Sequence, residues 1–389
     1  SPQALREQIS GAVSRDRRAS KGWMRSGRPN GATFSLICSR VGESAGSSSF
    51  GPATIVVGSL PESGQAARCQ RFGKARGGES GLADREIKIV RDSLRGHVKA
   101  LAGDIGPRTP FTGDSLVRAA AYIQSAFEDA GLSVTEQSYE YYGQRVANLL
   151  ATAPTTTGAS AYYVVGAHYD TVAVTPGADD NASAVAVMLE LARRVSESEL
   201  KIPVVFAAFT LEEPPAFLTG HQGSRIFVRT CQSKSDCVLG ALILEMVGYT
   251  SPRQHYPFVV RWAGYPAQGN FIGIVGNWRS REFGRAVLKG FRNNAHLPVE
   301  SLFLPFDGWI LPATRLSDHA SFWDAGWPAL MVTDTAFFRN PNYHLPSDRI
   351  DTLDFDFMAQ LVKSLEIALL ELLPRLPQSP TLAGHRVTL

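Results

Sequence analysis

The feature that most constrains this chain is an apolar stretch that ends in a histidine and an acid. Residues 162–165 read Tyr-Tyr-Val-Val, an apolar run with β-branched residues that is typical of a buried strand. His168 and Asp170 follow, so an imidazole and a carboxylate stand at the carboxyl end of this predicted strand. Open α/β sheets bind their ligands at that end. The stretch therefore predicts a functional site.

A second acidic group opens the next predicted helix. Asp179, Asp180 and Asn181 precede a helical pattern over residues 182–195. They can cap that helix or direct carboxylates back toward His168. A neutral imidazole with nearby carboxylates is a ligand set that zinc accepts. We therefore expect the rest of the chain to supply the missing ligands.

Strands and helices alternate along most of the chain. Two helical patterns, from residues 87 and 116, precede two predicted edge strands at 134–142 and 147–151. Apolar runs then predict further strands, and helical spacing predicts further helices. This order predicts an α/β fold with a mixed, mostly parallel central sheet and helices on both faces. The later strands are expected at 202–209, 241–246, 271–275, 299–304 and 327–333, and the later helices at 224–228, 281–293 and 355–373.

Composition divides the chain into three parts. Residues 1–84 are rich in Gly, Ser and Arg and lack periodicity, so they are predicted to be a disordered, low-complexity basic extension. This segment has a net charge of +6, which leaves −3 for the remainder of a chain whose total is +3. Because the extension has no periodic basic face, no nucleic-acid partner is expected. The catalytic domain is expected at residues 85–375 and a C-terminal tail at 376–389.

Two further expectations concern the environment of the protein. No apolar run approaches the roughly 18 residues of a membrane span, and no signal peptide is visible at the start. Four cysteines are too few for a disulfide scaffold. Cys231 and Cys237 are close enough in sequence to form a bridge, but free thiols fit the sequence equally well.

Acidic residues and histidines follow the later predicted strands. Glu212 and Glu213 come after residues 202–209, and His344 comes after residues 327–333. Glu245 lies inside the run Ala-Leu-Ile-Leu-Glu-Met-Val, where a buried carboxylate needs a partner. Side chains that meet at one edge of a sheet can build a two-metal site, with a carboxylate between ions about 3.5–4 Å apart.

Each of these groups also has an ordinary explanation. A lone His-x-Asp is usually a satisfied surface or capping pair, and Asp-Asp-Asn before a helix is usually a cap. A Glu-Glu pair after a strand is usually solvated charge. The metal hypothesis therefore depends on the conjunction of the groups and on their order along the chain.

The ordered set resembles the M28 family of dizinc peptidases, which includes aminopeptidase Y and the bacterial leucyl aminopeptidases. The similarity runs from about residue 94 to residue 373. It implies a zinc exopeptidase-like fold, two zinc ions per chain and a peptide substrate. It also implies a secreted or periplasmic location, whereas the oligomeric state is left open. The motifs that carry it are His168-x-Asp170, Gly177-Ala-Asp-Asp180-Asn181, Glu212-Glu213, Glu245, Ser317-Asp318-His319 and Tyr343-His344.

The resemblance implies a role for each candidate ligand. Asp180 would bridge the two zinc ions. His168 and Glu245 would complete the site of one ion, and Glu213 and His344 that of the other. Position 245 is a departure, because the best-known aminopeptidases of the family carry Asp there.

The resemblance also implies the catalytic groups. Glu212 would be the general base, and Asp170 would hydrogen-bond the second nitrogen of His168. The peptide bond between Asp180 and Asn181 would be cis. Tyr343 matches an oxyanion donor of some relatives. The tyrosine that better-known members carry before Ser-Asp-His has no match here, so the oxyanion donor stays open between Tyr343, Arg315 and zinc alone.

Substrate selection and two rival functions complete the hypothesis. Met246, Met331, Phe217 and Thr333 are the candidates for contacting the substrate side chain, and the most favoured function is an aminopeptidase. One rival is a glutaminyl-cyclase-like acyltransferase, whose relatives use one zinc ion and lack the first histidine ligand. The other is a binding domain that has kept the fold and lost catalysis.

Overall fold

The computed structural model describes residues 77–372, except for 154–155, 157–158, 160, 199–201, 259 and 261–262. Helix α2 (Gly77–Val98) is the first described element, and it begins eight residues before the predicted start of the catalytic domain. Most of the predicted N-terminal extension and the whole predicted C-terminal tail lie outside the described residues. The limits of the three predicted parts therefore remain predictions.

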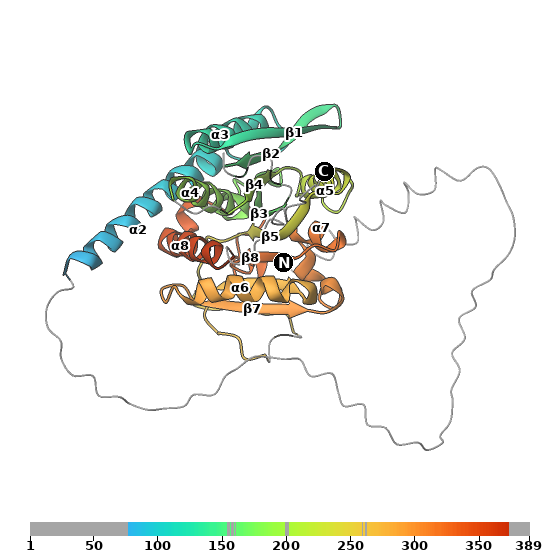
Figure 1. The fold of residues 1–389 in the computed structure, drawn as a ribbon. Coiled ribbons are helices and arrows are strands. Elements are labelled where there is room, and N and C mark those ends of the chain that lie inside the picture. Colours follow the sequence, from blue (N-terminus) through green and yellow to red (C-terminus); the bar gives the residue numbers. More distant parts are fainter. Residues whose placement is uncertain are drawn as a thin grey trace, which may run out of the picture. The chain divides into compact units, whose positions relative to one another are not determined.

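The described part of the chain contains an eight-stranded mixed sheet (Figure 1). The central strands β4, β3, β5 and β8 run parallel. On either side, β2 is antiparallel to β4, and β6 is antiparallel to β8. The prediction of a mixed, mostly parallel sheet is confirmed. In spatial order the strands are β1 (Ser133–Tyr141), β2 (Gln144–Thr152), β4 (Val204–Phe209), β3 (Ala161–His168), β5 (Cys237–Glu245), β8 (Ala329–Thr333), β6 (Ile272–Asn277) and β7 (Val299–Leu304).

Helices cover both faces of the sheet, as predicted (Figure 1). One face packs against α3 (Ser115–Asp129), α4 (Ala184–Glu197), α6 (Arg281–Arg292) and α8 (Phe355–Leu372), and α2 packs on α4 and α8. The other face packs against α5 (Gly223–Lys234) and α7 (His319–Asp324). Helix α7 was not predicted, because six residues are too few to show a helical period.

Short helical turns connect these elements. Two π-helical turns, η2 and η4, follow α2 and precede α4, and five 3₁₀ turns lie in the second half of the described chain. Their bounds are η2 (Lys99–Ile105), η4 (Ala178–Ser183), η5 (Trp278–Ser280), η6 (Phe306–Gly308), η7 (Pro312–Arg315), η8 (Ala336–Phe338) and η9 (Ile350–Thr352).

The apolar runs of the central strands reflect burial on both faces. In β3, Val165 packs into the core beneath α4, whereas Val164 packs on the opposite side with Phe227 and Phe322 of α5 and α7. The edge strand β1 instead alternates between exposed and partly buried residues. A parallel strand that is covered twice needs apolar residues at every position, which explains why the predicted strand positions were close to correct.

Two expectations about the environment can be compared with the structure. Cys231 and Cys237 are both free, so the structure favours the free-thiol alternative over the bridge. Among the described residues, no helix combines the length and apolar character that a membrane crossing requires.

Helices α6 and α8 approach each other closely at a glycine, which makes their packing testable. A Cβ atom at Gly290 would lie 2.4 Å from the Cα atom of Ala368. We therefore expect Gly290→Ala to lower the free energy of unfolding by about 1–3 kcal/mol through overpacking. Gly96→Ala is the matched control, because Gly96 is exposed on α2 and a Cβ atom there would have nothing within 4 Å.

The control should be neutral or should stabilise the protein by up to about 1 kcal/mol. Denaturant unfolding of both variants and the wild type measures the difference. Equal stability of Gly290→Ala and the wild type would show that the two helices can separate at no cost.

Candidate metal centre

The structure brings all five predicted ligands to the carboxyl edge of the parallel strands. His168 ends β3, Glu245 ends β5, and Glu213 lies four residues after β4. Asp180 lies in η4, and His344 lies in the loop that follows β8. These side chains are separated by up to 176 positions in the sequence, and the strand topology and the loops that follow the strands make them neighbours.

The five side chains form two groups that share one carboxylate. In the first group, His168 Nε2 lies 3.5 Å from Asp180 Oδ1 and 3.5 Å from Glu245 Oε2. In the second group, His344 Nε2 lies 3.2 Å from Asp180 Oδ2 and 3.2 Å from Glu213 Oε2. Asp180 therefore offers one oxygen to each group, which is the arrangement that a bridging ligand requires.

The candidate metal-ligating atoms of the two groups suit zinc in their chemical type. Three polar atoms of these side chains, His168 Nε2, Asp180 Oδ2 and Glu213 Oε1, are buried and have no hydrogen-bond partner among the described residues. Buried polar atoms without partners are costly unless another group binds them. Imidazole nitrogens and carboxylate oxygens are the ligand atoms that zinc takes.

The electrostatics of the site also favour a cation. Burial lowers the pKa of His344, but the charges of Glu213 and Asp180 outweigh it and raise the pKa to about 11. Burial likewise lowers the pKa of His168, and the charges of Glu245 and Glu212 raise it well above its ordinary value. The clustered carboxylates therefore attract positive charge, and a divalent ion would replace protons on the two imidazoles.

The chain holds Asp180 from both sides. The peptide bond between Asp180 and Asn181 is cis, as the family resemblance implied. The side chain of Asn181 donates to the carbonyl of Leu244 and accepts from the backbone N–H of Met246. The carboxylate of Asp348 accepts the backbone N–H groups of both Asp179 and Asp180. These hydrogen bonds tie the backbone around Asp180 to the end of β5 and to the loop after His344.

A buried arginine fixes the loop between His168 and Asp180. Arg108 is fully buried, and its guanidinium donates to the backbone carbonyls of Tyr169, Pro176 and Gly177. It also donates to the carbonyls of two residues that precede it. The guanidinium thereby closes the loop, which connects two of the candidate ligands. Neither Arg108 nor Asp348 was assigned a role from the sequence, because only tertiary contacts reveal the backbone groups that they bind.

Asp170 acts on more of the site than was predicted. Its two carboxylate oxygens accept the backbone N–H groups of Glu212 and Glu213, at 3.1 and 3.0 Å. His168 Nδ1 lies 3.2 Å from the backbone oxygen of Asp170 and 3.6 Å from its carboxylate. The nearest partner of His168 Nδ1 is therefore the backbone carbonyl of Asp170, and the carboxylate of Asp170 lies slightly farther away.

Glu212 lies beside the ligand groups but belongs to neither. Its Oε2 atom is 3.9 Å from His168 Nε2. Burial raises the pKa of Glu212 well above its ordinary value, and the charge of His168 opposes this shift. The neighbouring Glu245 is held differently, since it accepts a hydrogen bond of 2.8 Å from the hydroxyl of Ser317.

The two candidate oxyanion donors differ in their surroundings. The ring of Tyr343 stacks on that of His344, with centroids 3.8 Å apart. Arg315 donates to the backbone carbonyl of Asp307, pairs with Asp324 and lies over the ring of Trp309. The guanidinium of Arg315 is thus engaged with other groups, which favours Tyr343 between the two side chains.

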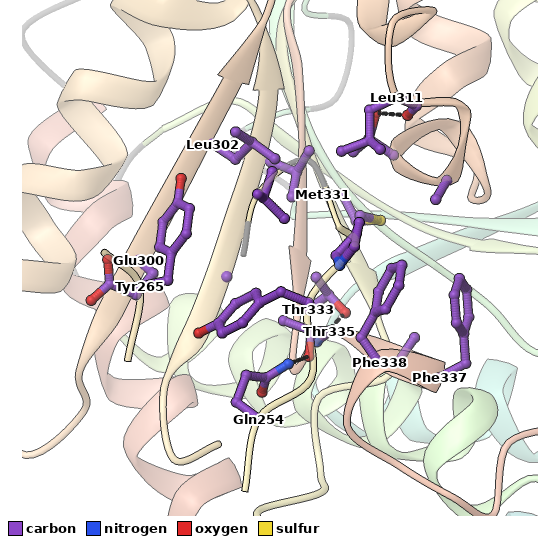
Figure 2. Close-up of a pocket in the computed structure, with 18 of the residues that line it drawn as sticks. Gln254, Tyr265, Glu300, Leu302, Leu311, Met331, Thr333, Thr335, Phe337 and Phe338 are labelled. Carbon is purple, nitrogen blue, oxygen red and sulfur yellow. Dashed lines mark hydrogen bonds between the residues drawn. The ribbon is translucent and has the colours of Figure 1, made fainter. Parts of the chain in front are cut away.

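A cavity of about 120 Å³ has Glu245 among its lining residues. Figure 2 shows part of its lining. Two of the four predicted substrate contacts, Met331 and Thr333, line it, and so does Tyr343. Met246 is fully buried and Phe217 lies elsewhere, so the structure places neither side chain in the cavity lining. Met246 has a positive φ directly after β5 and is buried in the core, and the substrate contacts predicted for Met246 and Phe217 remain predictions.

Known proteins resemble this chain in sequence and in fold. The family model described as peptidase family M28 matches residues 148–366. The Escherichia coli K12 protein YfbL is 36% identical over 282 residues, which cover 70% of this chain and 85% of YfbL.

Two fungal relatives carry functional names. A protein of Pyrenophora tritici-repentis named a probable zinc metalloprotease is 27% identical and is matched over 76% of this chain and 62% of its own length. A protein of Arthroderma otae named a probable leucine aminopeptidase is also 27% identical, and the shares are 62% and 60%. The crystal structure of the LapA aminopeptidase of Legionella pneumophila has the same fold, with a TM-score of 0.59, 22% identity and coverage of 79% of this chain and 80% of LapA.

The shared carboxylate yields a direct prediction about metal content. Asp180→Asn removes the charge that both ligand groups use, so we expect the variant to lose most of its bound zinc. Metal analysis after dialysis against zinc-free buffer measures this, and circular dichroism reports whether the fold is retained. Asp129→Asn, at an exposed position on α3, is the control and should keep the wild-type content. An Asp180→Asn protein with the full complement of zinc would rule out the bridging role.

Proposed function

The chain belongs to peptidase family M28 and is a metallopeptidase, and from this premise we propose that it is an aminopeptidase that uses two zinc ions. One observation carries the proposal. Two ligand groups share Asp180, and a further buried carboxylate, Glu212, lies next to them without belonging to either. The name of the Arthroderma otae relative supports the choice of an aminopeptidase.

In this proposal the five clustered side chains would hold the metals. His168 and Glu245 would bind one zinc ion, Glu213 and His344 would bind the other, and Asp180 would contribute to both sites. Zinc, when bound, lowers the pKa of a coordinated water toward about 7 and polarises the scissile carbonyl.

Glu212 transfers the proton in the proposed reaction. It accepts a proton from the water that attacks the scissile carbonyl, and it then donates that proton to the leaving amine. Its burial fits this exchange, because burial raises the pKa of Glu212 and so favours the protonated carboxyl that must donate to the leaving amine. The carboxylate of Asp170 accepts the backbone N–H groups of Glu212 and Glu213, and it thereby positions both the proposed base and a proposed ligand.

Tyr343 is the proposed side-chain donor to the oxyanion. It lines the cavity beside the ligands and stacks on His344, which holds the phenol ring at the edge of the site. A well-placed donor of this kind contributes about 3–4 kcal/mol to the transition state.

The cavity beside Glu245 supports recognition of the first residue of a peptide. It is lined mainly by apolar and aromatic side chains, which suits the side chain of a residue whose carbonyl lies at the metals. The carboxylates of Glu212 and Glu245 are close enough to attract the free amino group. A secreted or periplasmic location is part of the proposal and rests on the family resemblance.

The rival functions fit the site less well. A glutaminyl-cyclase-like enzyme would need one zinc ion and no first histidine ligand, whereas this chain has two ligand groups and places His168 in one of them. A binding domain without catalysis would have no reason to retain Glu212 beside a full set of five ligands.

The proposed function is tested with paired substrates. Aminoacyl 4-nitroanilides with a free amino group should be hydrolysed, whereas their N-acetylated counterparts should not. A chelator should abolish the activity, and added zinc should restore it. Equal cleavage of blocked substrates, or activity that survives chelation, would contradict the proposal. Conversion of N-terminal glutamine to pyroglutamate without peptide cleavage would support the cyclase instead.

The role of Glu212 is tested by a variant that keeps its shape and removes its charge. Glu212→Gln should retain both zinc ions and lose about 10²–10⁴-fold in kcat, because the proton acceptor is absent. Steady-state kinetics and metal analysis of the same preparation separate these effects. Glu140→Gln, at an exposed position on β1, is the control. Wild-type kcat in Glu212→Gln would place the general base elsewhere.

A further inference from the structure

The cavity beside the metal centre extends across the sheet to the edge strand β7 (Figure 2). Glu245 of β5 pairs with Thr333 of β8, which pairs in turn with Gly273 of β6. Gly273 then pairs with Glu300 of β7. Because paired residues of neighbouring strands point to the same face, Glu245 and Glu300 face one cavity from its two ends. Three strand spacings separate them, or about 14 Å.

The space between these two carboxylates is lined mainly by apolar side chains. Gly273 adds no side chain to the floor, and the next row of paired residues, Met331, Val275 and Leu302, is apolar. Phe338 and Leu311 also line the cavity. A side chain that enters from the metals therefore meets mainly apolar surface, together with the hydroxyls of Thr333 and Thr335, before it reaches β7.

Glu300 has no partner at the far end of this cavity. It is half-buried, and within the described part of the chain it makes no hydrogen bond or ion pair. Burial raises the pKa of Glu300, although the charge of Arg292 lowers it in part. A carboxylate in such surroundings is costly until a cation or a hydrogen-bond donor reaches it.

Two aromatic rings stand beside Glu300. The rings of Tyr256 and Tyr265 stack with centroids 5.8 Å apart, and Figure 2 shows Tyr265 next to Glu300, at the opposite end of the cavity from Phe337 and Phe338. The hydroxyls of the two tyrosines donate to the backbone carbonyls of Pro266 and Ser301, which fixes the rings. Aromatic faces that flank a carboxylate form a site for a cation.

We propose that this cavity selects peptides whose first residue has a long side chain with a terminal cation, namely lysine or arginine. The inference rests on the proposed function, since the cavity receives the first side chain only if the N-terminal residue is removed. The aliphatic stem packs against Val275, Leu302 and Met331, and the ammonium or guanidinium group pairs with Glu300. A leucine side chain would occupy only the part near the metals and would leave Glu300 unpaired.

The experiment compares substrates that share a four-carbon stem and differ in the charged group at its end. Wild-type protein with bound zinc should hydrolyse lysyl 4-nitroanilide with a kcat/KM about tenfold or more above that of the norleucyl compound, whose stem is as long but uncharged. Glu300→Gln should lower this lysine-to-norleucine ratio by about tenfold or more. Glu282→Gln removes a carboxylate that is exposed on α6, and it should leave the ratio unchanged.

A second variant tests the path of the side chain. A Cβ atom at Gly273 would meet its nearest neighbours, in Thr333 and Thr335, at 3.5 Å, so Gly273→Val should fold and should fill the cavity floor. The ratio of lysyl to alanyl hydrolysis should then fall, because only the long side chain crosses this point.

Three outcomes would overturn the proposal. A wild-type ratio near one that Glu300→Gln does not change would show that Glu300 selects nothing, while the aminopeptidase function would stand. A preference for lysine that appears only in the Arg292→Gln variant would show that Arg292 already neutralises Glu300 in the wild-type protein. Hydrolysis of no substrate with a free amino group would instead refute the proposed function itself.

Discussion

The whole centre depends on keeping several buried carboxylates close together against their mutual repulsion. Asp180, Glu213 and Glu245 are at most 7% exposed, and Glu212 and Asp170 lie beside them. Repulsion of this kind is relieved only by hydrogen-bond donors and by positive charge. The backbone N–H groups at residues 179 and 180 donate to Asp348, and those at 212 and 213 donate to Asp170. These hydrogen bonds orient the ligands. The remaining negative charge is directed at two points, where cations are expected.

The parallel strands explain why the ligands can be scattered along the chain. The parallel strands end at the same edge of the sheet, so ligands at the strand ends or in the loops that follow them lie close together. The loops then only need to orient the side chains. Arg108 and Asn181 do much of this aiming by binding backbone groups rather than other charges. The same strand register also positions residues beyond the metal centre. The pairing that runs from Glu245 through Thr333 and Gly273 reaches Glu300, so one row of the sheet links the reaction centre to the proposed specificity group.

Much of this structure could be predicted because its signals are local. An apolar run followed by His168, or Glu245 inside a second apolar run, is visible in a few residues of sequence. Arg108 and Asp348 could not be assigned roles, since their partners are backbone groups that the fold brings close from distant segments. Glu300 was missed for a similar reason. It sits in an ordinary short strand, and only the pairing of β5, β8, β6 and β7 shows that it faces the cavity.

The central claim is that one aspartate joins two metal sites, and anomalous diffraction from crystals of the zinc-loaded protein tests it most directly. Data collected on both sides of the zinc absorption edge should show two peaks about 3.5–4 Å apart, on either side of the Asp180 carboxylate. His168 and Glu245 should border one peak, and Glu213 and His344 the other. A single peak, or two peaks that do not share Asp180, would contradict the account.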